Sequence, residues 1–388
     1  MKNLARIAVM LVTVAGVIPP AAADENFWRE KAYPQVSYRG PEKALGAVLF
    51  NQGRGIVLNG REVAGDGYNF PPPLFIRFLH DAGWDAFKLN RKWVADNEVS
   101  ALAALHEQIA ALRTEGYKRI VLAGQSYGAW LSFIIAAREP NIQAILAAAP
   151  GGYDTSADGV ERNTERLVDE AGDLKATRVA LFLFDGDDRD IAWLKRGERI
   201  KRALDAHAIP NLVLDHPPDF KGHGGAYLGR FTRRYGECLV RFIAPEAVAM
   251  PFTCDLDHGL AVGADIALPA HMPLPSPPAG FPQDMAKYIG RWYGDYDNGA
   301  ARLFVATAVL PDGRLRFDYG AAGAPYSSEK PYVIRSLVPD HDGNALVYRD
   351  KTIERRFEYR SDGVIHFVWR PLDGKPQGDG IDLHRLPD

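Results

Sequence analysis

The chain has 388 residues, more than one ordinary hydrophobic core accommodates, so we expect two domains. Its 46 lysines and arginines nearly balance its 49 acidic residues, which gives a formal net charge of −3. No block of like charges stands out. This composition argues against nucleic acid and against a charged membrane surface as partners, and it favours a small molecule of low charge.

The N-terminal 23 residues have the pattern of a secretory signal peptide. Lys2 and Arg6 lead into an apolar run over residues 7–18, and small residues follow up to Ala23. An uncleaved anchor is the alternative, but this run is shorter than the roughly 20 residues that span a bilayer. We therefore expect cleavage after Ala23 and a secreted or periplasmic chain with no membrane span.

Cys238 and Cys254 are the only cysteines. After export, a disulfide between them would contribute on the order of 3 kcal/mol to stability. Two separate buried thiols are the alternative. Neither their spacing nor their neighbours indicate a metal site or a catalytic thiol.

Apolar runs alternate with helical patterns through the first two thirds of the chain. Strands are predicted at residues 43–50, 84–89, 119–123, 142–149, 178–184 and 211–215. With Ser100 as one candidate N-cap, helices are predicted at residues 71–82, 100–114, 129–137, 191–207 and 226–242. A short helical excursion is expected within residues 155–173. This alternation predicts an α/β fold, a doubly wound and mostly parallel sheet with helices on both faces.

A sharp turn, Gly124-Gln-Ser126-Tyr-Gly128, joins one of these strands to the helix that follows. Such a turn strains its middle residue, and glycines on each side let the strand and helix approach. It would present Ser126 above the sheet edge, with the backbone N–H of Tyr127 and the helix dipole beneath it. The alternative is a glycine-rich turn with a structural serine.

This turn resembles the nucleophile elbow of the α/β-hydrolase family, and the likeness covers roughly residues 40–245. It implies a serine hydrolase with a compact core, similar to dienelactone hydrolases and small esterases. In that family a loop after an earlier strand completes the oxyanion hole, often as His-Gly. Here that loop reads Gln52-Gly53-Arg54. Because backbone N–H groups serve as donors, Gly53 and Arg54 are both candidates; a plain loop is the alternative.

Four aspartates lie within six residues after the predicted strand 178–184. A carboxylate at this place would orient the catalytic histidine. By distance from the strand end we favour Asp188, with Asp190 second and Asp187 third. The family pattern sets the acid three residues after a glycine, where this chain has Arg189, so the register stays open.

His223 lies in a glycine-flanked loop after the last predicted strand. The order serine, aspartate, histidine is the one that this fold requires. His216 is the rival, but it lies closer to the strand end and two prolines follow it. A histidine with no role is the remaining alternative.

The implied reaction is cleavage of a small carboxylic ester through an acyl-enzyme on Ser126, with His223 as base and then acid. It requires no metal or cofactor. An amide or peptide substrate is the runner-up. The competing class is a non-catalytic binding protein with a degenerate hydrolase core.

A proline-rich linker leads to a C-terminal part in which apolar and polar residues alternate with a period of two. Eight alternating runs between residues 291 and 385, with turn signals between them, predict an antiparallel barrel or open sandwich. Gly290-Arg-Trp292 and Arg385 resemble the lipocalin (calycin) pattern, in which an arginine covers a tryptophan at the barrel floor. That likeness implies room for an apolar ligand; a filled barrel that serves for docking is the alternative.

The domain organisation expected is a signal peptide at 1–23, a catalytic domain at 24–245, a linker at 246–284 and a barrel at 285–388. All candidate catalytic residues precede the linker. We therefore expect a chain that ends near Pro278 to fold and to keep activity on small esters.

Overall fold

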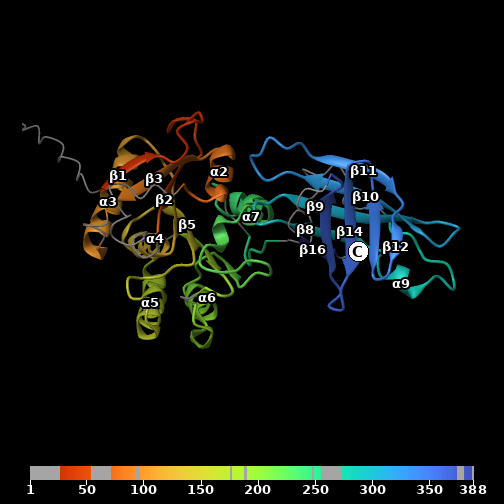
Figure 1. Cartoon of the computed structure of the whole chain (residues 1–388). Coiled ribbons are helices and arrows are strands. Elements are labelled where there is room, and N and C mark those ends of the chain that lie inside the picture. Colours follow the sequence, from red (N-terminus) through yellow and green to blue (C-terminus); the bar gives the residue numbers. More distant parts are fainter. Residues whose placement is uncertain are drawn as a thin grey trace, which may run out of the picture.

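A computed structural model describes residues 27–53, 71–92, 97–174, 177–187, 190–246, 249–254, 273–373 and 380–386. Two separate sheets, one of seven strands and one of nine, organise these residues. Figure 1 shows the two sheets at opposite ends of the molecule, with helix α7 (Gly229–Phe242) between them. The predicted signal peptide lies outside the described residues. Among the described helices, none combines the length and hydropathy that a membrane crossing needs.

The first sheet has the strand order β1-β3-β2-β4-β5-β6-β7. Its strands are β1 (Phe27–Lys31), β2 (Ala47–Asn51), β3 (Asp85–Arg91), β4 (Ile120–Gln125), β5 (Ile142–Ala148), β6 (Arg178–Leu183) and β7 (Asn211–Asp215). Only the pair of β1 with β3 is antiparallel. The central strands are nearly continuous apolar runs because both of their faces are covered.

Helices cover both faces of this sheet, so the predicted doubly wound α/β fold is confirmed. One face packs against α3 (Glu98–Thr114), α4 (Tyr127–Arg138), α5 (Ala157–Glu170) and α6 (Arg196–Ala206). The other packs against α2 (Leu74–Asp81) and α7. Asn97, rather than Ser100, caps α3, because its Oδ1 accepts the backbone N–H of Ser100 at 3.0 Å. Short turns of helix lie at Ala171–Asp173, Ala192–Leu194, Gly225–Tyr227 and, as α9, Gln283–Ala286.

The second sheet is antiparallel throughout and curls into a half-barrel, in the order β11-β10-β9-β8-β16-β15-β14-β13-β12. Its strands are β8 (Arg291–Asp295), β9 (Ala301–Val309), β10 (Leu315–Ala322), β11 (Tyr332–Leu337), β12 (Asp340–Asp342), β13 (Ala345–Arg349), β14 (Ile353–Tyr359), β15 (Ile365–Pro371) and β16 (Ile381–Arg385). Eight of these match the predicted runs. The ninth, β12, is an exposed polar segment without the alternation that marks a buried face.

Aromatic side chains fill the inner face of the half-barrel. The ring of Phe304 stacks on Phe317 and on Phe357, each with centroids 4.0 Å apart. Trp292 is buried and is the cross-strand partner of Arg385. The three phenylalanines and Trp292 belong to the core of the second sheet.

Candidate active site

Ser126 lies at the N-cap of α4 with φ 57° and ψ −125°, a strained backbone for a residue with a side chain. Its N–H donates to Ala148 in β5 at 2.9 Å, which ties the turn to the neighbouring strand. A Cβ added at Gly124 would lie 2.5 Å from the nitrogen of Ala129, and one at Gly128 would overlap the carbonyl oxygen of Asn51. The flanking glycines are therefore needed for the reason expected from the sequence.

Gly53 lies against the same turn. A Cβ added there would be 3.1 Å from the Cβ of Ser126 and 2.5 Å from Oε1 of Gln125. Tyr127 is the first residue of α4, at the positive end of the helix dipole. The structure thus brings two of the three expected oxyanion donors beside Ser126. The third, Arg54, lies outside the described residues.

A buried arginine holds the loop of Gly53, and it was not among the residues predicted from the sequence. Arg91, at the end of β3, donates from Nη1 to Oδ1 of Asn51 and from Nη2 to the carbonyl of Gln52, the latter at 2.6 Å. Asn51 in turn donates from Nδ2 to the carbonyl of Gly128 at 3.1 Å. A buried charge is tolerated only when it is paired or hydrogen-bonded, so these contacts fix the loop relative to the elbow.

The imidazole of His223 contacts the carboxylate of Asp187. Nδ1 of His223 lies 3.0 Å from both carboxylate oxygens of Asp187, whose side chain is completely buried. The carbonyl of His223 accepts a hydrogen bond of 3.1 Å from Nε2 of Gln125, the residue before Ser126. Among the described residues, the buried Nε2 of His223 has no hydrogen-bond partner. Three separate segments, after β4, β6 and β7, therefore converge at the carboxyl edge of the sheet.

The structure brings Asp187, the third choice from the sequence, to the histidine. The turn after β6 has φ 69° at Gly186, and the N–H of Asp187 donates back to the carbonyl of Phe184 at 3.3 Å. This tight return directs the first carboxylate after the turn toward the histidine loop, residues 216–228 between β7 and α7. That carboxylate comes earlier than a count along an extended chain predicts. Asp188, the first choice, lies outside the described residues.

Asp190 and His216 form a pair of their own and do not join His223. Nε2 of His216 is 2.5 Å from Asp190, and its Nδ1 is 2.8 Å from Asp215. Burial raises the pKa of Asp190, while the charges of Arg196 and His216 lower it. The two rival residues are thus bound to one another beside the site.

Arg196 of α6 is buried and ties three segments together. Its Nε donates to Oγ1 of Thr164 in α5 at 3.0 Å, its Nη2 donates to the carbonyl of Pro150, and its Nη1 lies 3.9 Å from Asp190. Burial lowers the pKa of this guanidinium, and the charge of Asp190 opposes that shift. The helical excursion predicted for residues 155–173 is therefore anchored to the sheet edge.

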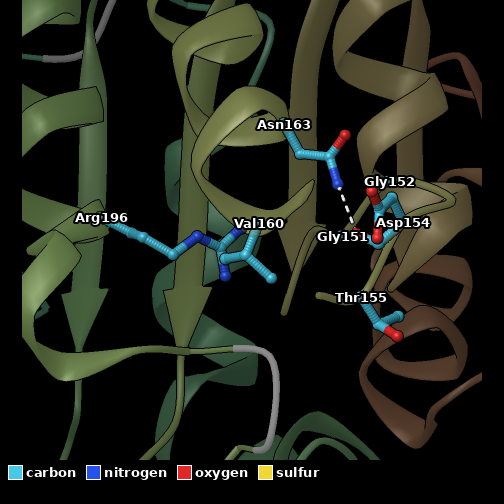
Figure 2. A pocket seen from close by; sticks show the side chains of 7 residues that line it. All are labelled: Gly151, Gly152, Asp154, Thr155, Val160, Asn163 and Arg196. Atoms are coloured by element: carbon cyan, nitrogen blue, oxygen red, sulfur yellow. Dashed lines mark hydrogen bonds between the residues drawn. The ribbon is translucent and has the colours of Figure 1, made fainter. Parts of the chain in front are cut away.

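A small pocket opens where these segments meet. It is lined by Gly151, Gly152, Asp154, Thr155, Val160, Asn163 and Arg196. Figure 2 shows Arg196 reaching toward Val160, and Asn163 donating to the carbonyl of Asp154 at 3.0 Å. The N–H of Gly151 donates to the carbonyl of Ser126 at 3.2 Å, so the pocket begins one hydrogen bond from the elbow. Within the described residues, no group of three histidine, cysteine or acidic side chains is placed to hold a metal.

Comparison with known proteins gives likeness to solved structures alone. No family model and no curated protein matches the chain. A putative dienelactone hydrolase from Klebsiella pneumoniae is 15% identical, with a TM-score of 0.39, over 57% of this chain and 98% of that one. An esterase of Pyrococcus furiosus is 15% identical, with a TM-score of 0.36, over 52% and 82% of the two chains. A putative α/β hydrolase from Agrobacterium tumefaciens is 16% identical, with a TM-score of 0.36, over 54% and 94%. At these scores the fold assignment depends on the strand order and the helix layers described above.

Proposed function

We propose that this protein is a serine hydrolase that cleaves a small carboxylic ester. One observation carries the proposal: the buried Asp187 is bonded to His223, and His223 is hydrogen-bonded to the residue that precedes Ser126. The strained turn at Ser126 supports it. A nucleophile, a base and an orienting acid in this chain order form the constellation that acyl transfer requires.

In the proposed mechanism, the hydroxyl of Ser126 attacks the ester carbonyl while Nε2 of His223 takes its proton. Asp187 holds the proton of the imidazole on Nδ1 and stabilises the imidazolium that forms. The N–H of Tyr127, with that of Gly53 or Arg54, stabilises the oxyanion. The imidazolium then protonates the departing alkoxide, and a water activated by His223 releases the acid and regenerates Ser126.

Export is part of the proposal. The disulfide between Cys238 and Cys254 supports an oxidising compartment, because such bonds persist in secreted and periplasmic proteins. For the second sheet, the stacked rings of the inner face favour a filled half-barrel over an apolar ligand cavity.

A fluorophosphonate probe tests the enzyme directly. We expect it to label the full-length protein and the variant Ser132→Ala, which removes another buried serine of the same helix. We expect no labelling of Ser126→Ala. A folded wild-type protein that the probe does not label would instead favour a non-catalytic binding protein.

The leaving group is tested separately with matched short-chain aryl esters and anilides. Amides are less reactive than esters, so a site adapted to esters should turn over the aryl esters far faster. Similar turnover of both would favour an amidase or peptidase on the same triad.

A further inference from the structure

Three arginines near the start of α7 contact the second sheet. Arg230 pairs with Asp297, in the turn between β8 and β9. Arg233 is buried and donates to the carbonyls of Gly299 and Gly323, the latter at 2.7 Å. Figure 1 shows α7 facing this end of the half-barrel. The helix that follows the histidine loop is thus also the helix on which the second sheet docks.

The backbones approach closely at this interface. A Cβ added at Gly229 would overlap the carbonyl of Asn298, and one at Gly299 would lie 2.7 Å from the carbonyl carbon of Gly229. The N–H of Arg230 donates to the carbonyl of Asp297 at 3.4 Å. Main chain therefore packs directly on main chain at this interface.

Arg234 makes the central contact. Its Nε and Nη2 donate to the two oxygens of Asp295 in β8 at 2.9 and 2.7 Å, in the two-pronged geometry that gives arginine its strongest pairs. The carboxylate of Asp295 is completely buried and also accepts the hydroxyl of Tyr293 at 3.0 Å. Burial alone lowers the pKa of Arg234, but the hydrogen bonds and charge of Asp295 raise it above its usual value. Arg234 therefore stays charged.

The third guanidinium nitrogen of Arg234, Nη1, contacts the histidine loop, residues 216–228 between β7 and α7. Nη1 of Arg234 lies 3.0 Å from Oδ2 of Asp219, four residues before His223. Nε2 of His384, in β16, is 3.6 Å from Oδ1 of the same aspartate. The backbone of Asp219 has φ 71°, a region that costs energy for a residue with a side chain and needs support from its surroundings.

We propose that the second sheet is a positioning element for the catalytic histidine, through a bridge formed by Asp295, Arg234 and Asp219. This inference rests on the proposed function. His223 lies between Gly222 and Gly224, and glycines give a loop wide conformational freedom. The bridge restricts that freedom at Asp219, four residues before His223. A displacement of about 1 Å at a catalytic group can cost on the order of 100-fold in rate.

The bridge changes the expectation for a chain that ends near Pro278. Such a chain would lack Asp295 and His384, and it would expose the arginines of α7 that the second sheet covers. We now expect it to lose activity even where the first sheet folds.

The test uses the full-length protein with Asp295→Asn and Asp219→Asn, each of which removes one charge of the bridge. Asp318→Asn is the matched control, because Asp318 is also a buried carboxylate of the second sheet, and it binds Arg335 at 3.0 Å and the N–H of Ser336, both in β11. We expect kcat on an aryl ester to fall between about 10-fold and 100-fold in both bridge variants, with KM within about twofold of wild type. The control should keep the wild-type kcat.

Hydrogen exchange supplies a readout that does not depend on activity. Amides of residues 216–228 should exchange faster in both bridge variants and at the wild-type rate in Asp318→Asn. Unchanged exchange of this loop in both bridge variants would overturn the inference, and so would a kcat within about twofold of the control. If the fluorophosphonate probe did not label Ser126 of the wild-type protein, only the proposed enzyme function would be rejected. Hydrogen exchange would still decide whether the second sheet holds the loop.

Discussion

Replacing Asp187 by asparagine separates the charge of this residue from its shape. The amide has nearly the volume of the carboxylate, so the buried position stays filled. It can, however, turn its NH2 group toward Nδ1 of His223, and the imidazole proton then moves to Nε2. In that tautomer the histidine cannot accept the proton of Ser126.

The size of the effect follows from the burial of the pair. The side chain of Asp187 is 0% exposed and that of His223 is 18% exposed, so solvent screens their interaction little. Two opposite unit charges about 4 Å apart, at an effective dielectric constant of about 20, attract by about 4 kcal/mol. That attraction is gained only when the imidazolium forms. Because each 1.36 kcal/mol is tenfold in rate, we expect kcat/KM to fall by about 10³-fold.

The assay is hydrolysis of an aryl acetate, with the melting temperature measured on the same samples. Asp188→Asn and Asp190→Asn serve as matched variants, since each removes one carboxylate from the same short segment. We expect both to keep kcat/KM within about tenfold of wild type. A larger loss in either of them than in Asp187→Asn would refute the assignment of the acid.

Three further predictions concern stability. Gly128→Ala forces a methyl group onto the carbonyl of Asn51, and we expect chemical denaturation to show a free energy of unfolding lower by about 1–3 kcal/mol. An unchanged free energy of unfolding would contradict the close approach at the elbow. Replacing Cys238 and Cys254 together by alanine should lower the free energy of unfolding by about 3 kcal/mol, and dithiothreitol should then have no further effect. Burial raises the pKa of Tyr235 from 10.0 to about 12. The contribution of this hydroxyl to the free energy of unfolding is therefore full below pH 10 and is lost as the pH rises through 12. In Tyr235→Phe the fall in unfolding free energy over this pH range should be shallower, and an unchanged slope would count against the burial of this tyrosine.

Elements whose signal is local were predicted well. Strands β11, β14 and β16 have the bounds that the alternation of their side chains gave. Strand β1 was not predicted, because it is an edge strand whose only partner in the sheet is β3, more than fifty residues away. Its hydrogen bonds depend on the tertiary fold and leave little trace in five residues of mixed polarity.

The same distinction applies to the candidate site. Glycines lie two positions away on each side of Ser126 and directly on each side of His223, and glycine marks the places where the backbone must turn sharply. The acid could not be fixed in this way, because its register depends on how the turn at Gly186 folds back. Arg91 could not be assigned either, since its partners, Asn51 and Gln52, come from a neighbouring strand.

The sequence of α7, most of whose residues are buried, does contain a feature related to the docking of the second sheet. Arg230 lies in the first turn of α7, where the positive end of the helix dipole disfavours a cation by about 0.3–1 kcal/mol, and Arg233 and Arg234 follow in the second turn. Carboxylates and carbonyls from elsewhere compensate these charges. Asp297 pairs with Arg230, Asp219 and Asp295 pair with Arg234, and two carbonyls of the second sheet accept from Arg233. In this chain the arginines at the start of α7 therefore indicate a partner surface with acidic groups. The predicted proline-rich linker does not make the second sheet, which supplies part of that surface, independent of α7.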